Sequence, residues 1–183
     1  MRAAIFLDRD GTLIREVGYL SSLTQIEILP DVPKALKLLK SLGYLLIVVT
    51  NQSGVARGFF DEPFVLQVHS VLQERFIEQG ARIDAFYYCP HHPTEGKPPY
   101  DIDCDCRKPK TGMLKKAASE HDIDISRSWV IGDSLVDAQL AQNAGCKGIL
   151  LKVDCDLLLP PSCIVKPDLW EAASYIASQG ALR

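Results

Sequence analysis

The stretch AAIFLDRDGT, residues 3–12, indicates the fold of the whole chain. Its first five residues, 3–7, are apolar without alternation, which is typical of a parallel strand covered on both faces of a sheet. Two carboxylates, Asp8 and Asp10, follow at once, and Gly11 permits a tight turn. If the chain leaves the sheet after Asp8, both carboxylates can face one pocket at the carboxyl end of the strand, where open α/β sheets bind ligands.

Short apolar runs alternate with amphipathic segments along the rest of the chain, which indicates β/α repetition and a parallel sheet flanked by helices. Strands are expected at residues 3–7, 45–49, 85–88, 129–131, 148–151 and 164–165. Helices are expected at residues 32–42, 61–79, 113–121, 135–143 and 169–178. Asp31 and Asp61 can cap the first two helices. The expected fold class is therefore α/β, with one Rossmann-like domain over residues 1–183.

The composition is that of an ordinary globular chain, because 47% of its 183 residues are apolar and 23% are charged. A net charge of −3 gives no basic surface, so we expect no nucleic-acid partner. No apolar run approaches the length of a membrane span, and the apolar start is too short for a signal peptide. We therefore expect a cytoplasmic protein with no membrane partner, and a monomer.

Polar side chains also follow two later strands of the expected sheet. The segment 50–53 (TNQS) comes after the second strand, and Asp133 comes after the fourth. Carboxylates that converge from separate strands form the oxygen-rich site that Mg²⁺ prefers. With Asp8 as nucleophile toward phosphorus, and Asp10 as proton donor and later base, such a site can hydrolyse a phosphate ester. The alternative interpretation makes both aspartates turn or cap residues.

These residues resemble the motifs of the haloacid dehalogenase (HAD) superfamily, in the same order and across almost the whole chain. The matching positions are residues 6–13 for the first motif, Thr50 for the second, Lys108 for the third, and Gly132, Asp133 and Asp137 for the fourth. Within the superfamily the chain most resembles the D-glycero-D-manno-heptose 1,7-bisphosphate 7-phosphatases, and next the histidinol-phosphate phosphatases. The segments that distinguish them are residues 18–19, 49–54, 87–93 and 104–109.

The resemblance implies a role for each matching residue. Asp8 is then the nucleophile and a Mg²⁺ ligand, and Asp10 is the acid/base and binds Mg²⁺ through its backbone carbonyl. Asp133 is the third protein ligand, while Thr50 and Lys108 stabilise the transferring phosphoryl group. The implied substrate contacts are Arg107 and residues of two loops: Glu16, Val17, Gly18, Tyr19, Asn51, Gln52 and Ser53.

Ser134 is one departure from the family pattern, because the heptose phosphatases carry a lysine that contacts substrate at this position. The difference bears on the exact substrate and leaves the phosphoryl chemistry unchanged. Asp137 is expected to orient Lys108 or Asp133 rather than bind the metal directly.

Residues 89–111 form a long, proline-rich segment without periodicity, and they carry a second set of metal ligands. Cys89-x-His91 and Cys104-x-Cys106 supply four ligands in two pairs, which fits a closed tetrahedral Zn²⁺ site. A structural metal can stabilise a loop that has no apolar core of its own. The same pattern occurs in the zinc-bearing members of the resembled families.

Other histidines and cysteines carry weaker signals. His92 is the alternative to His91 as a zinc ligand, and free thiols in a mobile loop are the alternative to a zinc site. Three cysteines without paired spacing are expected to be buried small hydrophobes or inert thiols: Cys146, Cys155 and Cys163. Two histidines in helical patterns are expected to be packing or surface residues: His69 and His121.

The segment between the first strand and the first helix, residues 11–30, is too short to hold a large cap domain, so we expect a short flap and an open site. The leading hypothesis is hydrolysis of the 7-phosphate of a heptose 1,7-bisphosphate, on the route to nucleotide-activated heptose for cell-surface polysaccharide. A bisphosphate needs extra cations, for which Arg107 and Arg57 are candidates. The alternatives are histidinol-phosphate or broader sugar-phosphate hydrolysis, and a catalytically silent module that binds phosphorylated ligands.

Overall fold

The structure is a computed structural model, and it describes residues 1–151 and 159–180. Its strands are β1 (Ala4–Leu7), β2 (Leu45–Asn51), β3 (Ala85–Cys89), β4 (Trp129–Gly132), β5 (Lys147–Leu151) and β6 (Cys163–Lys166). Its α-helices are α1 (Val32–Ser41), α2 (Gly54–Arg57), α3 (Glu62–Glu78), α4 (Gly112–His121), α5 (Leu135–Ala144) and α6 (Leu169–Ser178). The strands form one sheet in the order β3-β2-β1-β4-β5-β6, with parallel pairing throughout. The expected α/β class is confirmed.

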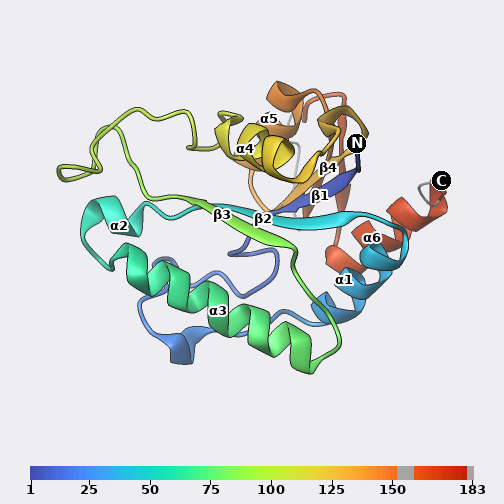
Figure 1. The fold of residues 1–183 in the computed structure, drawn as a ribbon, viewed down its shortest axis with the longest axis horizontal. Coiled ribbons are helices and arrows are strands. Elements are labelled where there is room, and N and C mark those ends of the chain that lie inside the picture. The colour runs from blue at the N-terminus through green and yellow to red at the C-terminus, as the bar shows by residue number, and fades with distance from the viewer. Residues whose placement is uncertain (152–158, 181–183) are drawn as a thin grey trace.

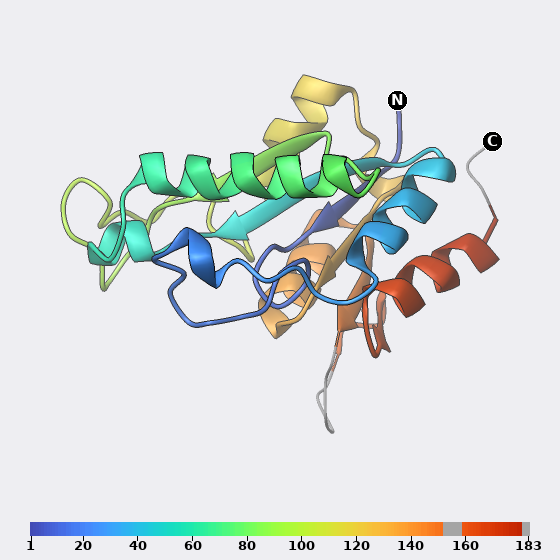
Figure 2. The same cartoon turned by 90° about the horizontal axis from the view of Figure 1, so that it is seen from below.

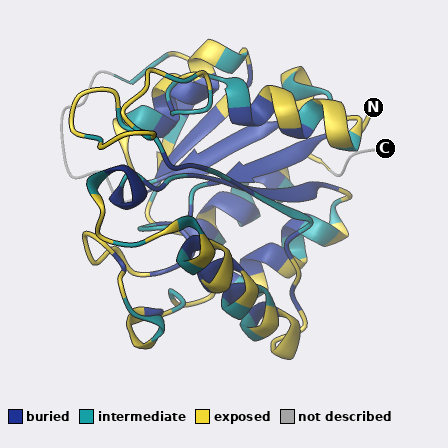
Figure 3. Cartoon of the chain, turned by 60° about the vertical axis from the view of Figure 1, so that its left-hand side comes forward, coloured by how far each residue is buried: buried dark blue, intermediate teal, exposed yellow. Residues whose placement is uncertain are grey.

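Helices cover both faces of this sheet. Helices α1, α3 and α6 lie on one face, and α4 and α5 lie on the other (Figures 1 and 2). In β1, Ile5 and Leu7 pack into the core on the α1 side, whereas Ala4 and Phe6 pack into the core on the α4 side. Because both faces are covered, the central strands β1, β2 and β4 are buried (Figure 3), and β1 is apolar at every position, as residues 3–7 predict.

The strand order fixes where a ligand can bind. From β1 the chain moves to β2 and β3 on one side, and it then returns to β4, β5 and β6 on the other side. The connections from β1 and β4 therefore leave in opposite directions at their carboxyl ends, which opens a crevice between them. Asp8 follows β1 and Asp133 follows β4, so both carboxylates lie at this switch point.

The helix starts test the two capping predictions. Asp61 caps α3 as predicted, because its side chain accepts a hydrogen bond of 2.9 Å from the backbone N–H of Phe64. The prediction for Asp31 was wrong, since its side chain makes no capping hydrogen bond. Asp31 has a φ of 59°, and a capping side chain normally needs extended backbone to reach the first-turn N–H groups. Its backbone carbonyl still accepts from Ala35 N–H.

The connection between β1 and α1 is short, as expected. It contains one 3₁₀ helix, Leu23–Gln25, and over the described residues no inserted cap domain covers the crevice. Helix α2 was not predicted because four residues are too few to show a helical period. Among the residues that the structure describes, no helix is both long and apolar enough to cross a membrane. The predicted inert thiol Cys155 lies outside the described residues.

Candidate active site

A cavity of about 370 Å³ opens at the switch point. Its wall includes many of the residues that the sequence places at the site: Asp8, Asp10, Glu16, Gly18, Tyr19, Thr50, Asn51, Gln52, Ser53 and Lys108. These residues come from the ends of β1 and β2, from the segment between β1 and α1, and from the long loop after β3. The fold therefore gathers four separate chain segments around one polar cavity.

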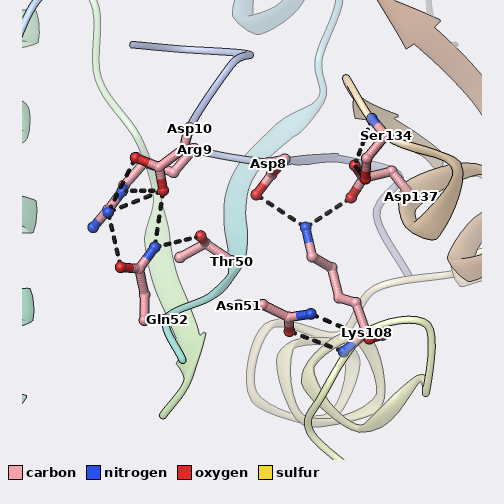
Figure 4. Close-up of polar contacts among 9 residues, drawn as sticks. All are labelled: Asp8, Arg9, Asp10, Thr50, Asn51, Gln52, Lys108, Ser134 and Asp137. Carbon is pink, nitrogen blue, oxygen red and sulfur yellow. Dashed lines mark hydrogen bonds and ion pairs between the residues drawn. The ribbon is translucent and has the colours of Figure 1, made fainter. Parts of the chain in front are cut away.

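Lys108 lies between two carboxylates (Figure 4). Its Nζ is 2.9 Å from Asp8 Oδ1 and 2.7 Å from Asp137 Oδ1, and only 4% of its side chain is exposed. Burial alone lowers the pKa of Lys108, but the two carboxylates outweigh it, so the pKa is raised on balance. Lys108 is therefore a cation fixed against Asp8.

Asp137 is fully occupied by its neighbours. Its Oδ1 accepts from Lys108, and its Oδ2 accepts from the hydroxyl of Ser134 at 2.8 Å and from the Ser134 N–H at 3.3 Å. Gly132 makes room for this carboxyl group, since a Cβ there would lie 2.2 Å from Asp137 Cγ. These contacts agree with the predicted orienting role of Asp137, and they give Ser134 a role as the capping residue of α5.

The carboxylates beside Lys108 fit a divalent cation. One oxygen each from Asp8, Asp133 and Asp137 lie within 4.8 Å of one another. Burial, aided by the charge of Asp137, raises the pKa of Asp8 to about 7 despite the opposing charge of Lys108, and it raises the pKa of Asp133 to about 6. A hard cation such as Mg²⁺ would supply the positive charge that these crowded oxygens need. Asp8 and Asp133 are the residues that would hold it, since Asp137 is engaged by Lys108 and Ser134.

Asp10 turns its side chain away from this cluster, toward Arg9 and Gln52 (Figure 4). Arg9 Nη2 lies 2.9 Å from Asp10 Oδ2, and Gln52 Nε2 donates to the same oxygen at 2.9 Å. Gln52 Nε2 also donates to Thr50 Oγ1 at 2.8 Å. A carboxyl group held in this way is available for proton transfer, and the metal contact expected of Asp10 involves its backbone carbonyl rather than its side chain.

Asn51 ties the end of β2 to the loop that carries Lys108. Its Nδ2 donates to the Lys108 carbonyl at 3.1 Å, and its Oδ1 accepts from the Lys108 N–H at 3.0 Å. The side-chain amide thus pairs with the backbone of Lys108 much as a neighbouring strand would. Asn51 and Gln52, both expected to contact substrate, hold other site residues in place as well as lining the cavity.

The predicted zinc ligands also come together. The sulfurs of Cys89, Cys104 and Cys106 lie 3.1–3.4 Å apart, and His91 Nδ1 is 3.4 Å from Cys106 Sγ. Tetrahedral zinc with Zn–S bonds of about 2.3 Å spaces its ligands by about 3.8 Å, so the cluster has the size of a closed Zn²⁺ site. The hydrogen bond between the sulfurs of Cys106 and Cys89 lowers the pKa of Cys106 to about 5, which favours the thiolate that a metal needs.

The structure distinguishes the two histidines that are candidate zinc ligands in this loop. His91 joins the thiol cluster, whereas His92 Nδ1 accepts from the Glu95 N–H at 3.0 Å within its own turn. Three soft or borderline sulfur ligands with one imidazole are typical of structural zinc and leave no position open for catalysis. The first ligand, Cys89, is the last residue of β3, and the last ligand, Cys106, lies two residues before Lys108.

Comparison with known proteins agrees with a phosphatase of the HAD superfamily. Residues 105–154 match the HAD-hydrolase-like family model. The D-glycero-beta-D-manno-heptose-1,7-bisphosphate 7-phosphatase of Pasteurella multocida is 46% identical over 151 residues, which are 82% of this chain and 82% of the relative. The enzyme of the same name from Photorhabdus laumondii is 40% identical over 173 residues, 94% of this chain and 88% of the relative.

The chain belongs to the heptose-1,7-bisphosphate 7-phosphatase family.

A solved structure of this family agrees with the fold. The D,D-heptose 1,7-bisphosphate phosphatase of B. bronchiseptica, crystallised with magnesium and phosphate, has a TM-score of 0.86. It is 31% identical in sequence, and the match covers 97% of this chain and 99% of that one. The family assignment thus extends beyond the short segment that the family model matches.

Val17 and Arg107, both expected to contact the substrate in this family member, are not part of the cavity wall. Val17 is exposed next to the wall residues Glu16 and Gly18. Arg107 donates from Nη1 to the backbone carbonyl of His91 at 3.1 Å, so the zinc loop holds its guanidinium group. Arg57 pairs with Glu95 of the same loop.

Sequence reasoning missed two residues of this family member's site, Arg9 and His69. Arg9 is 1% exposed although it is charged, and His69 is 5% exposed and lies beside it. The sequence signal for Arg9 was its position between Asp8 and Asp10 at the end of a buried strand, where its long side chain can extend into the protein interior. Nothing in the sequence pairs His69 with it, because the two residues are distant along the chain.

Gly11 provides a test of the metal site in this heptose phosphatase family member. It has a φ of 78°, and a Cβ there would lie 1.9 Å from Asp133 Oδ2. We expect Gly11→Ala to displace Asp133 and to lower Mg²⁺ affinity and turnover by about 10–100-fold, as the loss of supporting contacts around metal ligands commonly does. Activity measured against Mg²⁺ concentration checks this.

The matched control is Gly145→Ala. Gly145 has nearly the same φ, 70°, but a Cβ there would have nothing within 4 Å. Both variants carry the backbone strain of about 1–2 kcal/mol, and only the first has the clash. Equal losses of Mg²⁺ affinity in the two variants would show that strain, and not contact with Asp133, is responsible.

The raised pKa values predict how Mg²⁺ binding depends on pH. Without metal, Asp8 has a pKa of about 7 and Asp133 of about 6, so both are partly protonated in weakly acidic solution. Mg²⁺ requires the ionised forms and must displace these protons. We expect the apparent Mg²⁺ affinity to rise as the pH increases from 5 to about 8 and then to level off. Calorimetry in buffers of different ionisation enthalpy would detect the released protons, and affinity that does not change over this range would contradict the prediction.

Proposed function

We propose that this protein is a Mg²⁺-dependent phosphatase that removes the 7-phosphate of D-glycero-D-manno-heptose 1,7-bisphosphate through an aspartyl-phosphate on Asp8. The observation that carries the proposal is the placement of Asp8 against Lys108 and beside Asp133, at the switch point of the sheet. The family relationship supports the substrate, since relatives of that name align with most of the chain.

The first half of the reaction transfers the phosphoryl group to the protein. An oxygen of ionised Asp8 attacks phosphorus, and the bond between phosphorus and the sugar oxygen breaks. Asp10 donates its proton to that leaving oxygen, so the sugar departs as an alcohol. Lys108 stays within ion-pair distance of Asp8 and offsets the negative charge that gathers around phosphorus. Bound Mg²⁺ would reduce the repulsion between the carboxylate and the anionic phosphate.

The second half returns the protein to its starting state. Asp10, now a carboxylate, takes a proton from water as the water oxygen attacks the phosphorus of the aspartyl-phosphate. Inorganic phosphate leaves, and Asp8 is restored as a carboxylate. Thr50 is suited to assist both steps, because its oxygen already accepts from Gln52 and its own hydroxyl proton is free to donate to a phosphoryl oxygen.

The surroundings of the cavity support a small, polar substrate. No inserted domain covers the cavity over the described residues, and its outer wall includes the flap residues Glu16, Gly18 and Tyr19 and the segment after β2. A second phosphate has cations on the zinc-loop side. Burial, and then the charges of Arg107 and Arg57, lower the pKa of His92, which supports a cationic environment on this side of the site. We propose Arg107 as the contact to the second phosphate, in a protein that acts as a cytoplasmic monomer.

The decisive experiment is a comparison of phosphate release with Mg²⁺ from four substrates. These are the two anomers of the heptose 1,7-bisphosphate, fructose 1,6-bisphosphate and histidinol phosphate. Preference for one heptose anomer is the expected result, and it identifies the anomer. Preference for histidinol phosphate would keep the chemistry and overturn the substrate. No release from any of them, by protein that contains zinc, would favour a silent binding module.

A further inference from the structure

Arg9 is an unusual group to find inside a protein, because it is charged and only 1% exposed. Its Nε and Nη2 lie 3.1 and 2.9 Å from Asp10 Oδ2, and within residues 1–151 and 159–180 Asp10 is the acidic group that pairs with it. A buried cation whose counter-ion is a single carboxylate holds that carboxylate firmly. The orientation of Asp10 therefore depends on where the Arg9 guanidinium group lies.

The hydrogen bonds to Asp10 distinguish its two oxygens. Oδ2 accepts two hydrogen bonds, from Arg9 Nε at 3.1 Å and from Gln52 Nε2 at 2.9 Å. Oδ1 accepts one, from Arg9 Nη2 at 3.2 Å, among the described contacts. Oδ2 is thus saturated by its donors, and Oδ1 keeps a lone pair that can carry the proton.

Arg9 is in turn held by two groups besides Asp10. Gln52 Oε1 accepts from Nη2 at 2.9 Å, and His69 Nε2 lies 3.4 Å from Nη1. His69 belongs to α3, is 5% exposed, and stacks on the ring of Phe86 with centroids 4.8 Å apart. Because a guanidinium group can only donate, His69 Nε2 is the acceptor and its proton lies on Nδ1. Burial and the nearby Arg9 lower the pKa of His69 to about 3, in agreement with a neutral ring.

We propose that His69 is a positioning residue for proton transfer: by holding Arg9 from α3, it fixes the orientation in which Asp10 donates and accepts the proton. The inference rests on the proposed function, in which Asp10 is the acid/base. His69 touches neither the substrate nor the reacting atoms, and it acts through Arg9. The contact between His69 Nε2 and Arg9 Nη1 thus links helix α3 to the site.

The test is His69→Phe, which keeps the stacking on Phe86 and removes the acceptor. Rapid-quench experiments would follow formation of the phosphorylated protein from phenyl phosphate and from p-nitrophenyl phosphate. Phenolate needs a proton to leave, and p-nitrophenolate needs it far less. We expect formation from phenyl phosphate to slow about tenfold and formation from p-nitrophenyl phosphate to change less than about twofold. The hydrolysis step slows with both substrates, and KM is unchanged.

Three further proteins complete the test. His69→Gln restores an acceptor oxygen and should recover the wild-type dependence on the leaving group. His121→Phe is the matched control, because His121 on α4 contacts the Tyr87 hydroxyl and not Arg9. If H69F does not fold, His69→Met fills the same space with a flexible apolar side chain and carries the same expectation.

The outcomes separate clearly. Equal slowing with both aryl phosphates, or no slowing in H69F, would overturn the role of His69 as a positioning residue. Failure of H69Q to recover the leaving-group dependence would also count against it. Wild-type protein that forms no phosphorylated intermediate from p-nitrophenyl phosphate would overturn the proposed function and this inference together, and that result needs no variant.

Discussion

Replacement of Asp8 by asparagine is expected to abolish turnover, by on the order of 10⁴-fold or more, because the amide cannot form the aspartyl-phosphate. The variant should still fold. Burial already raises the pKa of Asp8 to about 7, so loss of this charge removes an unfavourable group from the interior. Lys108 keeps its partner Asp137 at 2.7 Å, and the asparagine oxygen can still accept from Lys108. The free energy of unfolding should therefore change by no more than about 1 kcal/mol.

Phosphate release, acid-stable labelling of the protein and thermal melting together check this expectation. Asp122→Asn is the matched control, because the Asp122 side chain is 76% exposed and pairs only with the N-terminal ammonium group among the described contacts. Its left-handed φ of 52° is one that asparagine tolerates. Residual turnover in D8N near the wild-type rate would exclude Asp8 as the nucleophile, and an unfolded D8N protein would show that Asp8 is mainly structural.

Loss of the zinc cluster is expected to have the second largest effect, on stability and on activity together. Cys106→Ser removes one ligand, and a strong chelator removes the metal from the wild-type protein. Opening a loop of about 15 residues costs about 3 kcal/mol, so the melting temperature should fall by about 6–12 °C. Activity should fall as well, because Arg107 and Lys108 directly follow the last zinc ligand. Without the metal, the loop places Lys108 between Asp8 and Asp137 less often.

The matched control for the cluster is Cys163→Ser. Cys163 is a free thiol whose sulfur donates to the Ala138 carbonyl, and it takes no part in the cluster. This variant should retain a full equivalent of zinc by elemental analysis and an activity close to that of the wild type. If C106S also retained its zinc and its melting temperature, the cluster would not be a structural metal site.

Much of the site could be predicted from the sequence, because strand ends and ligand spacings are local patterns. Asp8 and Asp133 each follow a run of apolar residues, and parallel strands bring their carboxyl ends to one edge of the sheet. The four zinc ligands occur in two close pairs within one segment, so their chemistry is visible before the fold is known. Such features depend on neighbours along the chain.

The rest depends on contacts between distant segments. The clamp between Asn51 and the Lys108 backbone joins residues from β2 and from the zinc loop, and no local pattern marks it. Helical periodicity indicates that His69 is a packing or surface residue, and the structure shows that it is buried, but periodicity does not reveal that its partner is a buried arginine. The capping prediction for Asp31 failed for the same reason. The left-handed backbone of Asp31 follows from how the chain turns into α1, which no local sequence pattern marks.

The position of Lys108 also bears on how the protein folds. Its ammonium group becomes stable inside only when Asp8 from β1 and Asp137 from α5 are both in place around it. We therefore expect the central strands to pair before the lysine is buried, because contacts so distant in sequence form slowly. On this expectation the catalytic centre is assembled late in folding, and a partly folded chain is inactive.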